Sequence, residues 1–118
     1  MRMWKVHPSL LCNKHLLGEH VEMHMFAGSI RCGKSVKGYI ENDLLEPQNI
    51  KKRHDMLAQE MINRGMHHET PLFITHAGGW PDHHMDEENS VQELRYRCTD
   101  CKERIDRAIM QEVICEAH

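Results

Sequence analysis

The densest group of polar side chains that could do chemistry lies between His15 and His24. His15 and Glu19 are four residues apart, and so are His20 and His24, with Glu22 between the last two. Residues at this spacing share one helix face, where imidazole and carboxylate groups could coordinate a divalent metal ion. The spacing is not that of the HExxH zinc proteases, and histidines on a solvated helix face are commoner than metal ligands.

Two cysteines near the C-terminus form a second candidate. Cys98 and Cys101 enclose two residues, a spacing that usually supplies half of a zinc site. The histidines that could complete it are His67, His68, His76, His83 and His84. The same thiols continue an apolar helical stripe, where cysteine packs as a small hydrophobic side chain. A redox pair needs a strand-to-helix context, which the pattern lacks. We therefore expect Cys98 and Cys101 to be thiols packed in the core, with a zinc site as the alternative.

Two clusters of basic side chains could contact phosphates, one in a glycine-rich segment and one at the start of an expected helix. Their members are Arg31, Lys34 and Lys37 in the first cluster and Lys51, Lys52 and Arg53 in the second. Both adjoin glycine or proline turns, which let a nucleic-acid backbone approach closely. Three cations at a helix N-terminus oppose the helix dipole, which indicates a compensating anion, although a solvated helix start explains them as well.

The first of three expected helices spans about 9–26 and carries the histidine-rich group. Its apolar positions recur at spacings of seven, four and four, which predicts one face packed on the core. These positions are Leu10, Leu17, Val21 and Met25. Gly28 is placed as its C-terminal stop.

A second helix is expected near 48–64, entered at Pro47 and closed by Gly65. Its inward face is Ile50, Leu57 and Met61. The acidic, proline- and glycine-rich stretch 70–89 predicts a loop, with at most a short strand at 72–75.

The third helix is expected near 90–115. Ser90 and Glu93 form a capping box that predicts its start. A stripe at helical spacing then follows: Val91, Leu94, Cys98, Cys101, Ile105 and Ile109. The expected fold is therefore mainly α, a compact single-domain bundle of about three main helices with irregular loops.

Composition excludes several classes of protein. With 118 residues, 40% hydrophobic and 28% charged, the chain suits one domain and is not a disordered segment. No apolar run is long enough for a membrane span or a signal peptide, so a cytoplasmic location in a bacterial or phage-infected cell is expected. Five cysteines without an export signal predict reduced thiols or metal ligands. Residues 1–66 carry a net charge of +3 and residues 67–118 carry −6, so a polyanion would contact the first part.

Three segments carry a pattern that composition alone does not explain. They are KHLLGEHVE at 14–22, GKSVKGY at 33–39, and a helix that opens with KKRH at 51–54 and closes with Arg64-Gly65. In this order they resemble the phage-type pyrimidine-dimer DNA glycosylases, the ultraviolet-repair endonuclease V family. The resemblance covers residues 1 to about 70, whereas the acidic loop and C-terminal helix of 71–118 have no recognised counterpart.

The resemblance implies a catalytic pair. In that family the mature N-terminal amine is the nucleophile, and a glutamate on the first helix is the acid or base. The glutamate corresponds to Glu22, and the family's spacing places the nucleophile at Met1. A methionine before the bulky Arg2 is normally retained, and Arg2 then matches the family's arginine that follows the nucleophile. Glu19 is expected to be structural, paired with a basic group or a cap.

The resemblance and the basic clusters together imply a set of DNA-binding residues. They are Arg2, Lys14, His15, Arg31, Lys34, Lys37, Lys51, Lys52 and Arg53. The family has arginines on its first helix where this chain has Val21 and Met25, so weaker phosphate anchoring is expected. No metal and no cofactor is expected at the chemical step.

The predicted function is that of a DNA-repair N-glycosylase with abasic-site β-lyase activity, cleaving at ultraviolet pyrimidine dimers through an imine on the N-terminal amine. The expected partner is double-stranded DNA containing damaged or abasic sites, bound by a monomer, with no membrane partner. One alternative is a non-catalytic DNA-binding module of the same fold, for which replacing Glu22 would change nothing. Another is a zinc metalloprotein that uses the histidine-rich helix or Cys98 and Cys101.

Overall fold

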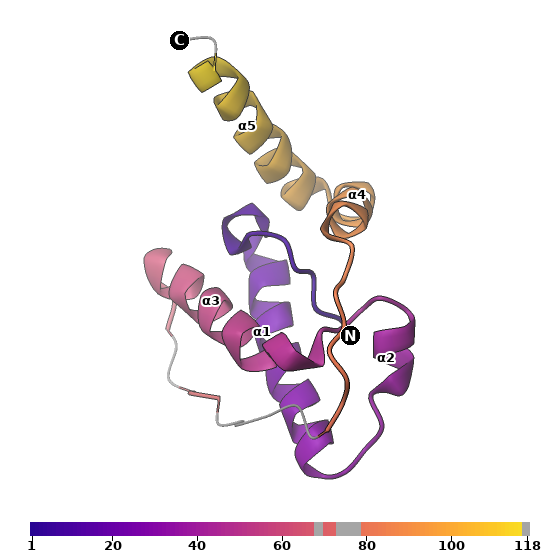
Figure 1. The fold of residues 1–118 in the computed structure, drawn as a ribbon. Helices are drawn as coiled ribbons and strands as arrows, with labels where there is room; N and C mark the ends of the chain where they lie inside the picture. The colour runs from indigo at the N-terminus through magenta and orange to yellow at the C-terminus, as the bar shows by residue number, and fades with distance from the viewer. Residues whose placement is uncertain (68–69, 73–78, 117–118) are drawn as a thin grey trace.

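The structure is a computed structural model that describes residues 1–67, 70–72 and 79–116, with side chains described to residue 112. It confirms a mainly α fold, and the described residues contain no strand (Figure 1). The helices are α1 (Asn13–Arg31), α2 (Lys37–Glu41), α3 (Ile50–Asn63), α4 (Glu87–Arg97) and α5 (Thr99–Glu116). Two 3-10 turns, η1 (Pro8–Leu10) and η2 (Pro47–Asn49), precede α1 and α3. Most of the expected strand at 72–75 lies outside the described residues.

The core lies where α1 packs against α3. α3 agrees with its prediction, because Ile50, Leu57 and Met61 are all buried. Gly65 also closes that helix as expected, with a φ of 78° that favours glycine.

The prediction for the inward face of α1 is wrong. Leu17, Val21 and Met25 are 42%, 54% and 52% exposed. The buried positions of α1 are Leu16, Glu19, His20, Met23, Phe26 and Ala27. The inward face accepts the carboxylate of Glu19 because a buried arginine from α3 bonds to it, and a search for apolar periodicity cannot find such a face.

The ends of α1 also differ from the prediction. The helix begins after Cys12, whose sulfur accepts a hydrogen bond from the backbone N–H of His15. It continues past Gly28 to Arg31, and Gly33 follows with a φ of 73°. The glycine whose left-handed conformation ends α1 is therefore Gly33, five residues after the predicted Gly28.

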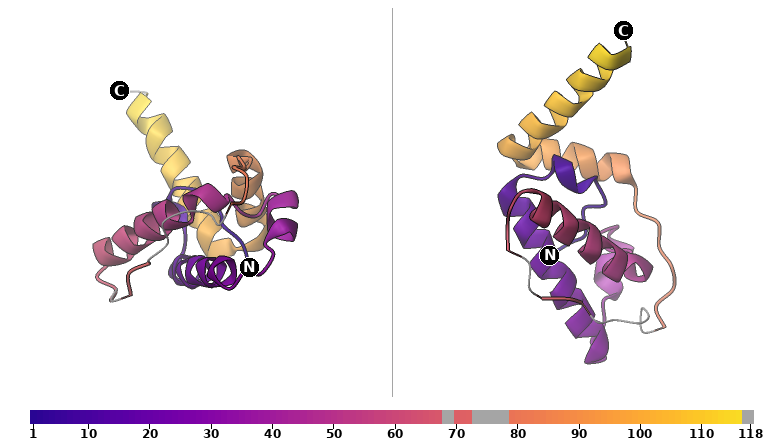
Figure 2. Two further views of the ribbon diagram at one scale, coloured as in Figure 1. Left: turned by 60° about the horizontal axis from the view of Figure 1, so that its bottom comes forward. Right: turned by 90° about the vertical axis from the view of Figure 1, so that its left-hand side faces the viewer.

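The single C-terminal helix predicted near 90–115 is two helices. α4 begins at Glu87 because Asp86 caps it, accepting a bond from the backbone N–H of Asn89 at 3.1 Å. Cys98 has extended backbone angles (φ −132°, ψ 113°) and separates α4 from α5. The predicted capping box is therefore wrong. In both figures α5 leads away from the α1–α3 pair (Figures 1 and 2).

The N-terminal segment runs through the interior, and residues 2–4 are buried. The backbone N–H of Met3 donates to the carbonyl of Leu44 at 2.8 Å, which ties the segment to the turn after α2. None of the described helices is long and apolar enough to cross a membrane.

Candidate active site and DNA-binding surface

The first residue lies beside the middle of α1. The amino nitrogen of Met1 is 3.9 Å from Oε1 of Glu22, and the backbone N–H of Arg2 points at Oε2 from 3.5 Å. The side chains of Met1 and Glu22 are 16% and 28% exposed. An amine and a carboxyl, both open to a ligand, therefore meet at one point of the surface.

The environment of Glu22 alters the protonation of its carboxyl. Burial raises the pKa of its carboxyl above the usual value, and the charge of Glu19 acts in the same direction. The backbone N–H of Arg2 and the N-terminal ammonium oppose this rise without cancelling it. A carboxyl with a raised pKa exchanges protons more readily near neutral pH than an ordinary glutamate does.

Glu19, one turn before Glu22, has a different environment. Its two oxygens accept bonds from Nε and the second terminal nitrogen of Arg53 at 2.5 and 2.9 Å, in a pair that is almost wholly buried. Arg53 also donates to the carbonyl of Val6 at 2.6 Å. The expectation that Glu19 pairs with a basic group is confirmed. The pair joins α1 to α3. All three guanidinium nitrogens of Arg53 are bonded within the protein, to Glu19 or to Val6.

Arg2 is likewise engaged inside the protein. Its guanidinium donates to Glu93 and to the hydroxyl of Ser90, both at 2.7 Å, and stacks over Trp4 at 3.9 Å from the ring centre. Ser90 and Glu93 lie on α4, so this residue fastens the N-terminal segment to the C-terminal region. No local pattern in the sequence signals these contacts, and the spacing of Ser90 and Glu93 predicted a capping box instead.

The other predicted DNA-binding residues are surface side chains, with one exception. The exposed ones are Lys14, Arg31, Lys34, Lys37, Lys51 and Lys52. Lys37 pairs with Glu41 at 3.6 Å and Lys51 with Asp55 at 3.0 Å, exposed contacts that a phosphate can displace at little cost. The exception is His15, which is half-buried with Nδ1 at 3.3 Å from the sulfur of Cys12.

The metal-ligand groupings differ from those read from the sequence. His20 and His24 do lie together, and His54 of α3 joins them, with ring centres 4.7–5.0 Å apart. His15 does not share a site with Glu19. It belongs to a second group with Cys12, Cys98 and Cys101.

Among the histidines expected to complete a zinc site with Cys98 and Cys101, those that the structure describes lie elsewhere. His83 bonds to Asp43 at 2.6 Å, and His67 and His84 are exposed. His68 and His76 lie outside the described residues. The prediction overlooked Cys12, although Cys12 and His15 repeat the two-residue spacing of the C-terminal pair.

The family model for pyrimidine dimer DNA glycosylases matches residues 1–74. The chain belongs to this family. The match covers more than half of the chain and includes α1, α2, α3, Met1 and Glu22, whereas α4 and α5 lie beyond it. No curated protein and no solved structure matches the chain.

Membership in this glycosylase family confirms the resemblance read from the three segments. It also assigns the protein to a class of enzymes whose substrate is DNA. α4, the helix that holds Arg2, lies in the part of this glycosylase that the family match does not reach.

Proposed function

We propose that the protein is a DNA glycosylase with abasic-site lyase activity that acts at ultraviolet pyrimidine dimers. The observation that carries the proposal is the 3.9 Å approach of the Met1 amine to the carboxyl of Glu22. A nucleophile beside an acid or base is the minimal arrangement for an imine mechanism.

The first step is attack of the unprotonated Met1 amine on C1′ of the damaged nucleotide. The C–N bond to the base breaks, and its electron pair leaves with the base. The attached nitrogen then loses one proton to solvent, and its electron pair forms the C1′=N bond as the C1′–O4′ bond breaks. O4′ takes up a proton, and a protonated imine links Met1 to C1′. As a class, α-amines are weaker bases than lysine side chains by about 2–3 pKa units, so a larger fraction is nucleophilic at neutral pH.

Glu22 acts on the developing sugar and on the imine. Its carboxylate stabilises the positive charge that forms on the sugar, and it then takes a proton from C2′. The C2′–H electron pair forms a double bond to C3′, and the 3′ phosphate leaves, which cuts the strand. Water finally releases the amine. The step sequence uses an amine and a carboxyl and no metal.

Exposed lysines and Arg31 supply the contacts to DNA. Lys14, Lys34, Lys37, Lys51 and Lys52 belong to the part of the chain with positive net charge and have side chains open to solvent. They would bind the backbone on either side of a flipped or kinked lesion. Arg2 and Arg53 are not included, because their guanidinium groups bond to Glu93 and Glu19.

Cleavage of a duplex carrying one defined lesion tests the proposal. The wild-type protein is expected to cut a duplex with a single pyrimidine dimer and one with an abasic site, and to leave the undamaged duplex intact. Glu22→Gln is expected to bind the dimer duplex and cut neither substrate. Binding without cleavage by the wild-type protein would instead indicate a DNA-binding module, and cleavage by Glu22→Gln at the wild-type rate would exclude Glu22 from the chemistry.

A further inference from the structure

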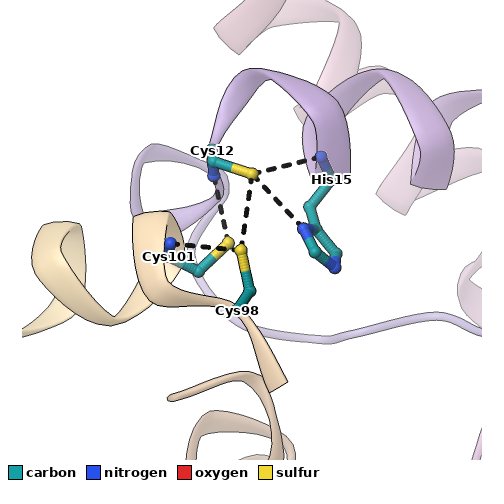
Figure 3. Close-up of side chains that lie close together, drawn as sticks. All are labelled: Cys12, His15, Cys98 and Cys101. Carbon is teal, nitrogen blue, oxygen red and sulfur yellow. Dashed lines mark hydrogen bonds between the residues drawn. The ribbon is translucent and has the colours of Figure 1, made fainter. Parts of the chain in front are cut away.

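Four potential metal ligands from opposite ends of the chain meet at the start of α5. Cys12 and His15 come from the beginning of α1, and Cys98 and Cys101 from the beginning of α5 (Figure 3). Their ligand atoms all lie within 4.8 Å of one another. The cluster includes neither Met1 nor Glu22 and has no part in the proposed reaction.

The cluster consists of two halves with the same local geometry. Cys12 and Cys98 each precede a helix, and their carbonyls accept the first helical bonds, from Leu16 and Lys102, both at 2.9 Å. Their sulfurs accept bonds from the backbone N–H groups three residues on, at 3.5 Å for Cys12 and 3.4 Å for Cys98. Each half therefore presents a capping cysteine and a second ligand from the first helical turn.

The distances suit a tetrahedral zinc ion. Zn–S bonds of about 2.3 Å and Zn–N bonds of about 2.0–2.1 Å at tetrahedral angles put two sulfurs about 3.8 Å apart and a sulfur and a nitrogen about 3.5 Å apart. The sulfurs of Cys12 and Cys98 are 3.8 Å apart, and Nδ1 of His15 is 3.3 Å from the sulfur of Cys12. The described cysteines are free thiols, so no disulfide competes for these ligands.

The backbone around the cluster supplies hydrogen-bond donors to the sulfurs. The N-termini of α1 and α5 both point their partial positive charge at the sulfurs, and the backbone N–H of Cys12 donates to the sulfur of Cys101 at 3.2 Å. Cys101 is fully buried, whereas Cys98 and His15 are half-buried and leave a path for a metal to enter. The ring of Trp4 meets the His15 ring edge-on at 5.8 Å and holds its orientation.

We propose that Cys12, His15, Cys98 and Cys101 bind one Zn²⁺ in a closed structural site. Three thiols release their protons to solvent on binding, and the neutral imidazole supplies the fourth ligand. With all four positions filled by protein, the ion has no open position for substrate and serves to hold α5 against the start of α1. The site thereby joins the family-matched region to the two C-terminal helices, of which α4 holds Arg2.

Metal analysis of the full chain, purified without chelators, tests the proposal. The wild-type protein is expected to contain about one zinc ion per chain, and a Cys98→Ser, Cys101→Ser double variant less than about a tenth of that. Cys32→Ser is the matched control, because Cys32 is an exposed free thiol outside the cluster and its replacement should leave the zinc content unchanged. Metal-free wild-type protein, or a double variant with as much zinc as the control, would overturn the proposal.

A second set of variants keeps the test valid if the double variant unfolds. His15→Cys exchanges imidazole for thiolate and preserves four ligands, so it should retain zinc, whereas His15→Ala leaves three ligands and should bind at least about tenfold more weakly. With cobalt in place of zinc, the sulfur-to-metal absorption should grow from wild type to His15→Cys. An unchanged spectrum would place the metal elsewhere, for example at His20, His24 and His54, and would contradict the assignment.

Chelation gives a readout independent of DNA cleavage. A strong chelator should lower the melting temperature of the wild-type protein and of Cys32→Ser, because the free energy of metal binding contributes to folding. Equal melting temperatures with and without chelator would count against a structural ion. Since none of these three measurements involves DNA, failure of the zinc proposal and failure of the proposed function are distinguishable.

Discussion

The guanidinium of Arg2 bonds to the carboxylate of Glu93 at 2.7 Å, across 91 positions of the sequence. Arg2 follows Met1 directly, and its backbone N–H points at Glu22. Through this contact α4, which lies outside the family-matched residues, holds the residue that follows the proposed nucleophile.

Weakening this contact should slow the chemistry and leave DNA binding intact. Glu93→Gln is expected to lower kcat by about tenfold with little change in KM, because a small displacement of a nucleophile reduces the rate of the reaction more than it weakens binding. Single-turnover cleavage of abasic DNA would measure this effect. Glu88→Gln, an exposed acid on the same helix, is the control. A fall in melting temperature that accounts for the lost activity would show that Glu93 only stabilises the fold.

Replacing Glu22 should increase stability at neutral pH while abolishing activity. Because burial raises the pKa of Glu22 above its unfolded value, the native state disfavours the ionised form. The resulting loss of stability grows as pH rises through the unfolded pKa and is complete above the raised pKa. Glu22→Gln removes the ionisation and resembles the protonated form. Its melting temperature should exceed that of wild type at pH 7, and the difference should vanish below about pH 4. A variant less stable than wild type at pH 7 would contradict this account of the carboxyl.

Replacing Glu19 should have the opposite effect on stability. Glu19→Gln leaves Arg53 buried without its counter-charge, and breaking a buried pair in this way costs about 3 kcal/mol or more. Chemical denaturation of the two glutamine variants side by side would measure the contrast. Similar unfolding free energies for Glu19→Gln and wild type would mean that the Glu19–Arg53 pair does not fasten α1 to α3.

The exposed apolar side chains of α1 should limit affinity for DNA. Val21 and Met25 lie on the same helix as Glu22, and arginines at both positions should add about two phosphate contacts. The plot of log Kd against log salt should then steepen by about 1.8. Ile109→Arg adds a similar cation to α5, which points away from the α1–α3 pair, and should change the slope little (Figure 1). Equal slopes for all the variants would place the DNA elsewhere.

The sequence predicted those features that depend on local signals. Ile50, Leu57 and Met61 recur at helical spacing and a glycine follows them, which was enough to predict α3. The segment 14–22 was enough to indicate the family. The face of α1 could not be predicted in this way, because its burial of Glu19 depends on Arg53, 34 positions later. Ser90 and Glu93 have the spacing of a capping box, yet Asp86 caps the helix, and those side chains bond to Arg2.

Neither candidate site could be predicted from local sequence signals alone. No local pattern links Met1 to Glu22. They could be predicted to act together only because the family has a characteristic spacing between its nucleophile and its glutamate. Cys12 and Cys101 are 89 positions apart, and only the folded chain brings the backbone of one to the sulfur of the other. The repeated spacing of Cys12–His15 and Cys98–Cys101 was the one available signal for that site.

Reductive trapping on abasic DNA tests the central claim most directly. Sodium borohydride added during the reaction should reduce the imine and cross-link the protein to DNA, and mass spectrometry of the digested adduct should locate the link on the α-amine of Met1. Acetylating that amine should abolish the cross-link. An adduct on a lysine side chain, or trapping that persists at the wild-type level after acetylation, would contradict the assignment of Met1 as the nucleophile.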